Sequence, residues 1–413
     1  MVDTGIVGQL GDPVYIGAVA VGSMIFNFVY WTFGFLRMGT SGLTAQAFGA
    51  QDEEEIRLSL ARPILIACVF GAALIVLQSV LLWVVFHLVA ASPEVEAGAR
   101  AYFKIRIWSA PFSLANFALL GWLIGLQRSH LALLLQLFLN GLNAGLDAMF
   151  VLHFDLGIRG IAQGTLISEI AAALFGAFLA FWQLNTVRPR FALQRLLDWP
   201  SFRRCLVINR EIMLRTLCLL LVFAFFTAKS ADFGNLLLAA NTILMHFVSF
   251  TAYFLDGFAF AAEAFVGQAI GRRSRSRLIR SIYLSSAWSG GTALILGLMI
   301  YLFGPFAMDF LTASPEVRLE VRRYLLWVAV LPVVSFWCWQ LDGIFIGATR
   351  TYEMQLAAFR SLVAFLVFWW AFRQIGNHGL WLSMVLFNVM RGFFLGRYLP
   401  LLIRSVSRPG FET

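Results

Sequence analysis

The sequence predicts an all-α membrane protein that crosses the bilayer many times, and three observations support this fold class. Of the 413 residues, 60% are hydrophobic and only 13% are charged, against roughly 25% charged in a typical soluble domain. The mean hydropathy is +0.80. Apolar runs of about 20 residues, long enough for a hydrocarbon core of about 30 Å, recur along the chain. At roughly 35 residues per helix and loop, we expect about 12 crossings.

Apolar runs bounded by glycine, proline and charged residues predict eleven complete helices. In chain order they cover residues 15–42, 60–89, 101–126, 132–152, 158–182, 206–227, 236–270, 278–310, 317–346, 354–372 and 380–403. Residues 2–10, before the turn Gly11-Asp12-Pro13, have the composition of a further helix. They are too few to cross at 1.5 Å per residue. We therefore expect a first helix of which this chain holds only the second half.

Short segments recur along the chain and predict an internal duplication. The matches at an offset of 222 are residues 91–95 with 313–317, 125–128 with 347–350, and Gly157 with Gly379. Residues 45–48 also resemble residues 262–265, at an offset of 217. Each half holds six helices once the first is counted whole. The halves are then two parallel six-helix repeats around a central cleft, related by an axis along the membrane normal.

The duplication predicts two lobes joined by a linker. We expect an N-terminal lobe over residues 1–185, a linker over residues 186–208 and a C-terminal lobe over residues 209–413. The linker is rich in arginine and is interrupted by Pro189 and Pro200. Most cations of the short loops fall on the same side as this linker, so the positive-inside rule assigns the linker and the C-terminus to the cytoplasm.

Charge and cysteine usage exclude several other classes. The net charge is +9, but the arginines stand between apolar runs, which indicates membrane topology and not nucleic-acid binding. The four cysteines are far apart and lack CxxC spacing, so neither a disulfide framework nor a zinc site is expected. No cleavable signal sequence is expected, because Met1-Val2-Asp3 does not begin the basic, apolar and small-residue pattern of one. The acidic run at residues 53–55 is typical of a solvated loop edge.

Polar residues inside the predicted N-terminal lobe form a candidate cation site. Asn143 and Asp147 are four residues apart and share one helix face. Asp147 and Thr165 are each nine residues from the external turn, and Asp3 is nine from Asp12, which gives all three a depth of about 13 Å. A buried carboxylate can take up a proton near neutral pH, and these oxygen ligands also suit Na⁺. Alternatively, Asn143 and Thr165 only hydrogen-bond to neighbouring helices.

The second repeat lacks this polar set. The residues 222 positions beyond Asn143, Asp147 and Thr165 are Phe365, Trp369 and Phe387. A difference between duplicated halves favours a specialised task for the polar set over shared scaffolding.

The predicted C-terminal lobe holds three intramembrane acids, Asp256, Glu263 and Asp342. Burying an ionisable side chain in a membrane costs free energy, so such residues are treated as candidates for a functional role. They suit a cationic substrate or a gate at the inner mouth. An interhelical pair with a nearby arginine is the alternative, and Glu263, near the arginines of residues 272–280, is better explained as structural.

These stretches resemble the multidrug and toxic compound extrusion (MATE) transporters, and within them the DinF-type branch. The resemblance rests on residues 2–11, the Asn143-to-Asp147 pair followed by Gly157 and Gly160, Asn209-Arg210 with Arg215, residues 256–267, and residues 341–350. It implies that Asp3, Asn143, Asp147 and Thr165 form the cation-coupling site, with H⁺ or Na⁺ as the coupling ion and no cofactor. Asp256, Glu263 and Asp342 fall where related branches carry functional acids.

The resemblance also implies a function. We expect a monomeric antiporter of the cell membrane, not an enzyme, that exports drugs or amphipathic cationic metabolites. A flippase for lipid-linked precursors, from the wider superfamily, is the alternative, but it would need a cleft lined with cations. A membrane acyltransferase would need a nucleophile or a His-Asp constellation at the interface, and the sequence has neither.

Overall fold

The computed structural model describes residues 13–88, 92–184, 193–196, 198–311 and 314–406. Over these residues the chain is helical, without a strand. Eleven helical segments of the described chain are long and apolar enough to cross a membrane. The predicted all-α polytopic fold is therefore confirmed. The expected partial first helix, residues 2–10, lies outside the described residues.

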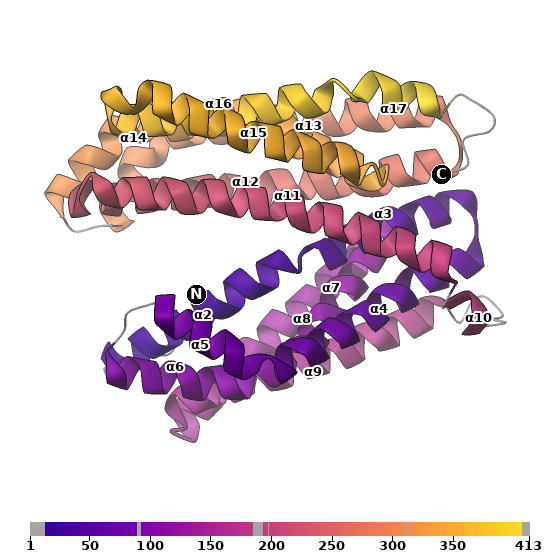
Figure 1. Ribbon diagram of the computed structural model, residues 1–413, viewed down its shortest axis with the longest axis horizontal. Helices are drawn as coiled ribbons and strands as arrows, with labels where there is room; N and C mark the ends of the chain where they lie inside the picture. The colour runs from indigo at the N-terminus through magenta and orange to yellow at the C-terminus, as the bar shows by residue number, and fades with distance from the viewer. Residues whose placement is uncertain (1–12, 89–91, 185–192, 197, 312–313, 407–413) are drawn as a thin grey trace. The chain divides into compact units, whose positions relative to one another are not determined.

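The chain divides into two compact units, shown in Figure 1. Unit 1 comprises residues 1–44 and 52–206, and unit 2 comprises residues 45–51 and 207–413. The helices of unit 1 are α2 (Pro13–Thr32), α3 (Phe35–Ala50, whose last turns count with unit 2), α4 (Glu53–Val76), α5 (Gln78–Leu88), α6 (Pro93–Arg106), α7 (Ala110–Gly125), α8 (Ser129–Ala148), α9 (Gly157–Leu184) and α10 (Leu193–Leu196). A 3₁₀ turn, η1 (Ile107–Ser109), joins α6 to α7, and a π-helical segment, η2 (Met149–His153), extends α8.

Long helices dominate unit 2 and run alongside one another in Figure 1. They are α11 (Trp199–Asp232, whose first turns count with unit 1), α12 (Asn235–Gly271), α13 (Arg275–Leu311), α14 (Pro315–Gly347), α15 (Thr351–Phe372), α16 (Asn377–Gly396) and α17 (Leu399–Ser405), with a 3₁₀ turn η3 (Arg373–Ile375) after α15. Of the predicted linker 186–208, the described part holds α10 and the start of α11.

The duplication is visible in how matched helices begin. Ser92 caps α6 and Ser314 caps α14, each side chain accepting a hydrogen bond from the backbone three residues on, with a proline in the first turn. A serine cap followed by proline favours a helix start because it satisfies a free N–H and presets the backbone. The recurring Ala-Ser-Pro-Glu-Val motif is therefore a helix-start signal used twice.

The turns repeat with the same offset. Gln51 and Arg273 both have a positive φ, of 58° and 52°, and so do Gln127 and Thr349, of 60° and 52°. Left-handed backbone is uncommon outside glycine, so its occurrence at two pairs of positions 222 residues apart shows a duplicated fold. The resemblance between residues 45–48 and 262–265, at an offset of 217, is not part of this register.

Glycines at matched positions permit close helix crossings. A methyl group at Gly121 on α7 would overlap the backbone of Arg37 on α3, and one at Gly343 on α14 would overlap the backbone of Ala259 on α12. These pairs are again related by 222 residues. Close approach of helix backbones at small residues is the usual way in which membrane helices pack.

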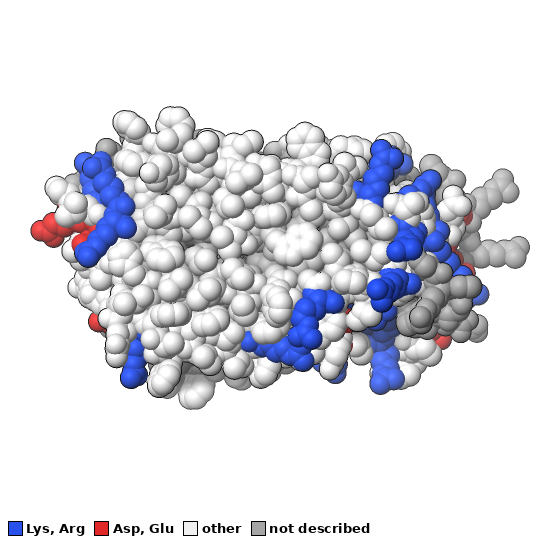
Figure 2. All heavy atoms as spheres, turned by 90° about the horizontal axis from the view of Figure 1, so that it is seen from above, with Lys and Arg blue, Asp and Glu red and all other residues white. Residues whose placement is uncertain are grey.

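Charged side chains are unevenly distributed over the face shown in Figure 2. Lys and Arg lie toward two opposite ends of that face and at its lower edge in the view, and the rest of the surface is mostly uncharged. Large apolar side chains such as Trp182, Tyr253 and Trp288 are more than half exposed. An uncharged apolar surface of this kind is what a lipid-facing protein presents.

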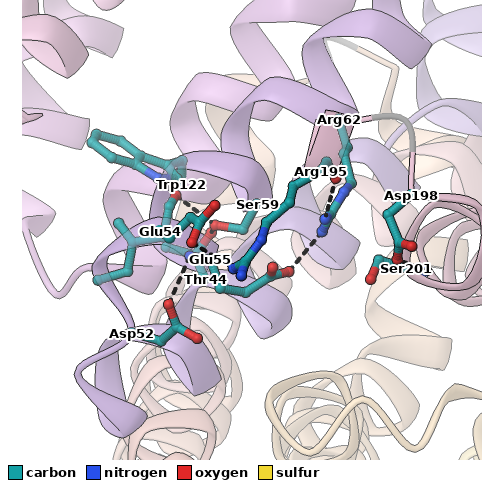
Figure 3. A network of polar contacts seen from close by, with 11 residues as sticks. Thr44, Asp52, Glu54, Glu55, Ser59, Arg62, Trp122, Arg195, Asp198 and Ser201 are labelled. Atoms are coloured by element: carbon teal, nitrogen blue, oxygen red, sulfur yellow. Dashed lines mark hydrogen bonds and ion pairs between the residues drawn. The ribbon is translucent and has the colours of Figure 1, made fainter. Parts of the chain in front are cut away.

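A polar network holds α10 against the start of α4 in unit 1 (Figure 3). Arg62 donates to the Glu55 carboxylate at 2.7 Å and to the backbone oxygen of Arg195 at 3.1 Å, and Arg195 pairs with Glu54 at 2.5 Å. Two of the three acids at residues 53–55 are therefore ion-paired. The expectation of a merely solvated loop edge is wrong for them, because Arg62 of the same helix pairs with Glu55 and Arg195, distant in the sequence, pairs with Glu54.

Candidate functional site

Unit 1 brings three of the four predicted cation-site residues together. The amide nitrogen of Asn143 donates to the Asp147 carboxylate at 3.2 Å and to the Thr165 hydroxyl oxygen at 3.3 Å. Asp147 is fully buried, and Thr165 is 6% exposed. The fourth predicted residue, Asp3, lies outside the described residues. The result is a buried carboxylate whose neighbours are an amide and a hydroxyl from two adjacent helices.

The backbone around Asp147 is shaped to accommodate its carboxylate. Gly164 on α9 faces Asp147, and a methyl group at Gly164 would overlap the Asp147 carboxylate. The π-helical segment η2 begins two residues after Asp147 and continues to the turn where Asp155 and Gly157 have positive φ. Single π-helical turns occur often at functional sites, where they redirect side chains. The π-helical segment, the turn and the Gly164 contact all lie within the stretch of chain from Asp147 to Gly164.

The matched positions of unit 2 form an aromatic cluster instead. Phe365 and Phe387 pack edge to face with ring centroids 5.9 Å apart, where Asn143 and Thr165 hydrogen-bond in unit 1. Phe225 contacts both Phe365, at 5.6 Å, and Trp369, the counterpart of Asp147, at 6.2 Å. Aromatic pairs of this geometry stabilise a core beyond their burial. The same fold position is thus polar in unit 1 and apolar in unit 2.

A further carboxylate of unit 1, Glu169, escaped the sequence analysis. It lies one helical turn beyond Thr165 on α9, and its carboxylate accepts a hydrogen bond from Asn116 on α7 at 2.7 Å. Arg106 on α6 acts on it electrostatically, but Glu169 makes no ion pair within the described part of the chain. The sequence alone could have identified Glu169 as a candidate, because an acid among apolar residues such as 161–181 is rare in a membrane helix.

The position that matches Glu169 carries the opposite charge. It is Arg391 on α16, which donates to the Asp342 carboxylate at 2.5 Å and to the Asn388 side-chain oxygen at 3.2 Å. Arg215 on α11 pairs with the same Asp342 oxygen. Arg215, Asp342 and Arg391 are each less than a tenth exposed. The alternative interpretation of Asp342, a pair with a nearby arginine, therefore describes its geometry.

Of the other two predicted acids of unit 2, Asp256 acts on the Asp342 cluster, and Glu263 lies further along α12. Asp256, on α12, is partly buried and acts electrostatically on Arg391. Glu263 is 1% exposed and stands two helical turns further along α12, about 10 Å away. Asp256 and Asp342 thus share Arg391, whereas Glu263 stands apart.

Taken together, the chain is a helical membrane transporter built from two related units, one with a buried carboxylate site and the other with a buried arginine–aspartate cluster. The family model MatE matches residues 1–149 and 212–371. The chain belongs to the MATE family of transport proteins.

Known proteins of this family match nearly the whole chain. DNA damage-inducible protein F of Escherichia coli K12 is 38% identical over 96% of this chain and 86% of its own length. A probable multidrug resistance protein NorM of Rhizobium meliloti is 25% identical over 98% of this chain and 89% of its own. The expected DinF-type resemblance is confirmed.

Solved structures agree on the fold. A transporter of the MOP superfamily from Pyrococcus furiosus superimposes with a TM-score of 0.89 at 20% identity and covers 99% of this chain and 92% of its own. An outward-facing MATE transporter of the same superfamily gives a TM-score of 0.88 at 20% identity, with 98% and 92% covered. The chain is therefore a multi-pass transporter and not an enzyme, and the relatives named as multidrug transporters do not favour the lipid-precursor flippase.

Proposed function

We propose that this protein is a secondary antiporter that exports drugs or amphipathic, cationic metabolites in exchange for H⁺ or Na⁺. The observation that carries the proposal is the buried Asn143–Asp147–Thr165 cluster, whose counterparts in unit 2 are aromatic. A carboxylate kept at this buried position in one unit, where the other unit has aromatic rings, favours a function for its charge, because such a group costs several kcal/mol in a membrane.

Asp3 completes the proposed coupling site. The residue 222 positions beyond Asp3 is Phe225, and Phe225 contacts the counterparts of both Asn143 and Asp147. This register supports the proposal that Asp3 belongs to the same group. Two carboxylates, an amide and a hydroxyl offer proton acceptors and the hard oxygen ligands that Na⁺ prefers.

The proposed mechanism is competition between cation and substrate. With its carboxylates ionised, unit 1 favours a cationic substrate. Loading of H⁺ or Na⁺ removes that negative charge, the substrate leaves outward, and a rearrangement between two states resets the transporter. Each ligand can drive this exchange only through its different affinity for the two states.

Transport by the full-length protein in proteoliposomes tests the proposal. A fluorescent lipophilic cation is the substrate, and pH and Na⁺ gradients are imposed separately. We expect Asp147→Asn to abolish gradient-driven transport while the protein stays folded. Asp155→Asn is the matched control, because it makes the same chemical change in the exposed turn where either residue tolerates a positive φ. Full activity of Asp147→Asn would refute the assignment.

A second variant separates charge from position. Gly164→Ala keeps the Asp147 carboxylate but pushes it from its place, so transport should fall about tenfold or more, as misplacement of a reacting group by 1 Å costs up to about a hundredfold. Gly145→Ala on α8 is the control, since a methyl group there meets nothing within 4 Å. Equal activity of the two alanine variants would count against a positioned carboxylate.

The remaining expectations belong to the same proposal. The protein acts as a monomer in the cell membrane, with the linker and the C-terminus in the cytoplasm. The clustering of arginine at residues 272–280 and 203–210 supports this orientation by the positive-inside rule.

A further inference from the structure

A cavity between α12 and α13 in unit 2 is polar at one end and apolar at the other. Its volume is about 330 Å³, at the lower limit for a ligand pocket. Phe258, Phe265 and Gln268 line it from one face of α12, at the spacing of successive helical turns. Arg277 and Trp288 line it from one face of α13. Such a cavity is a groove between two consecutive helices.

The polar end of the groove is positively charged. Arg277 and Arg280 both line it and are exposed, and neither makes an ion pair with a described residue. Gln268 and Ser281 add neutral hydrogen-bonding groups at the same end. Two guanidinium groups without a carboxylate partner favour binding of an anion. Phosphate oxygens match the arrangement of the guanidinium N–H donors.

The other end of the groove suits hydrocarbon. Trp288 is 69% exposed, Phe265 47% and Leu284 44%. From Arg277 to Trp288 the helix rises about 16 Å, which covers the distance from a headgroup into the upper acyl region. A soluble phosphate compound would leave these side chains uncovered, whereas a lipid would cover them.

We propose that the α12–α13 groove is a binding site for an anionic phospholipid, with Arg277 and Arg280 on its phosphate and its acyl chain along Phe265, Leu284 and Trp288. The arginines lie at the end of unit 2 that the positive-inside rule assigns to the cytoplasm, where anionic lipids attract basic residues. Basic pockets between membrane helices on that side bind such headgroups in general. This site is independent of the cation-coupling residues of unit 1.

Native mass spectrometry of the full-length protein tests the proposal with two probes of identical chains, phosphatidylglycerol and phosphatidylcholine. We expect phosphatidylglycerol to bind at least tenfold more tightly. The double variant Arg277→Gln/Arg280→Gln should weaken it about 25-fold, at about fivefold per arginine. Arg272→Gln/Arg275→Gln is the matched control: it removes two exposed cations from the same turn that do not line the groove, and should cost less than threefold.

A steric variant and a competitor test the apolar half. Ala261→Trp fills the groove from α12 and should displace phosphatidylglycerol without changing any charge. Glycerol 3-phosphate at millimolar concentration should not compete. Equal binding of the two lipids, equal loss in both arginine pairs, or displacement by glycerol 3-phosphate would each overturn the proposal. The assay reads binding, so its outcome does not depend on whether the protein is an antiporter.

Discussion

Two carboxylates on neighbouring helices of unit 1, Asp147 and Glu169, lie in different surroundings. Asp147 is fully buried beside Asn143 and Thr165, whereas Glu169, one turn along α9 from Thr165, accepts from Asn116. Arg106 on α6 acts electrostatically on Glu169, and Tyr30 on α2 belongs to the same group of side chains. A carboxylate held by a neutral amide and not by an ion pair can change its protonation without breaking a salt bridge.

Glu169→Gln should therefore lower proton-driven transport by about a hundredfold or more, the usual contribution of a positioned acid or base. Glutamine still accepts from Asn116, so the thermal stability should change little. Proteoliposome transport under a pH gradient measures the effect, with thermal unfolding as the folding check. Glu169→Asp keeps an ionisable group and should retain more activity. Unchanged transport in Glu169→Gln would limit Glu169 to a structural role.

The cluster around Asp342 illustrates the opposite case. One carboxylate oxygen serves both Arg215 and Arg391, and all three residues are nearly buried. Buried ion pairs are costly to break because the remaining charge loses its partner. This cluster holds α11, α14 and α16 together. Asp342 therefore forms the interhelical pair with arginine that the sequence analysis gave as the alternative interpretation.

At the scale of helices, the duplication operates through matched glycines and matched turns. Gly121 and Gly343 are equivalent, and each meets the backbone of a neighbouring helix. Neither position has room for a methyl group. The close approach at both crossings therefore depends on the absence of a side chain.

Gly121→Ala and Gly343→Ala should each destabilise the protein by about 1–3 kcal/mol, the usual cost of overpacking. Thermal unfolding in detergent measures the loss. Gly291→Ala on α13 is the control, because a methyl group there meets nothing within 4 Å and alanine favours a helix by about 1 kcal/mol. If all three variants unfold at the same temperature, the crossings are less tightly packed than described.

At the scale of the whole molecule, the segment that leads from one repeat to the next is tied to unit 1. Arg62 is 4% exposed and reaches both Glu55 and the backbone of Arg195 on α10 (Figure 3). At the start of α11, the hydroxyl and backbone N–H of Ser201 lower the pKa of Asp198, as expected of a helix cap. The contacts of Arg62 fix α10 on the end of α4.

Arg62→Ala should release α10. We expect a loss of about 2 kcal/mol, below the 3–5 kcal/mol typical of a fully buried pair because Glu55 is 37% exposed. Hydrogen–deuterium exchange of residues 193–196 should become faster. Arg203→Ala, an exposed arginine of the same unit, should leave that exchange unchanged. Unaltered exchange in both variants would mean that α10 is held by other contacts.

The sequence by itself determined the fold class, the duplication, and the meeting of Asn143, Asp147 and Thr165. Hydrophobic runs and helix periodicity are local properties, and depth below a turn follows from the rise per residue. The tertiary structure decided what local pattern cannot contain: that Asp342 is shared by two arginines, that Glu169 meets Asn116, and that Glu54 and Glu55 are ion-paired. Apart from the Glu55–Arg62 pair, which lies within α4, these contacts join residues 49 to 141 positions apart, so they exist only once the helices have packed.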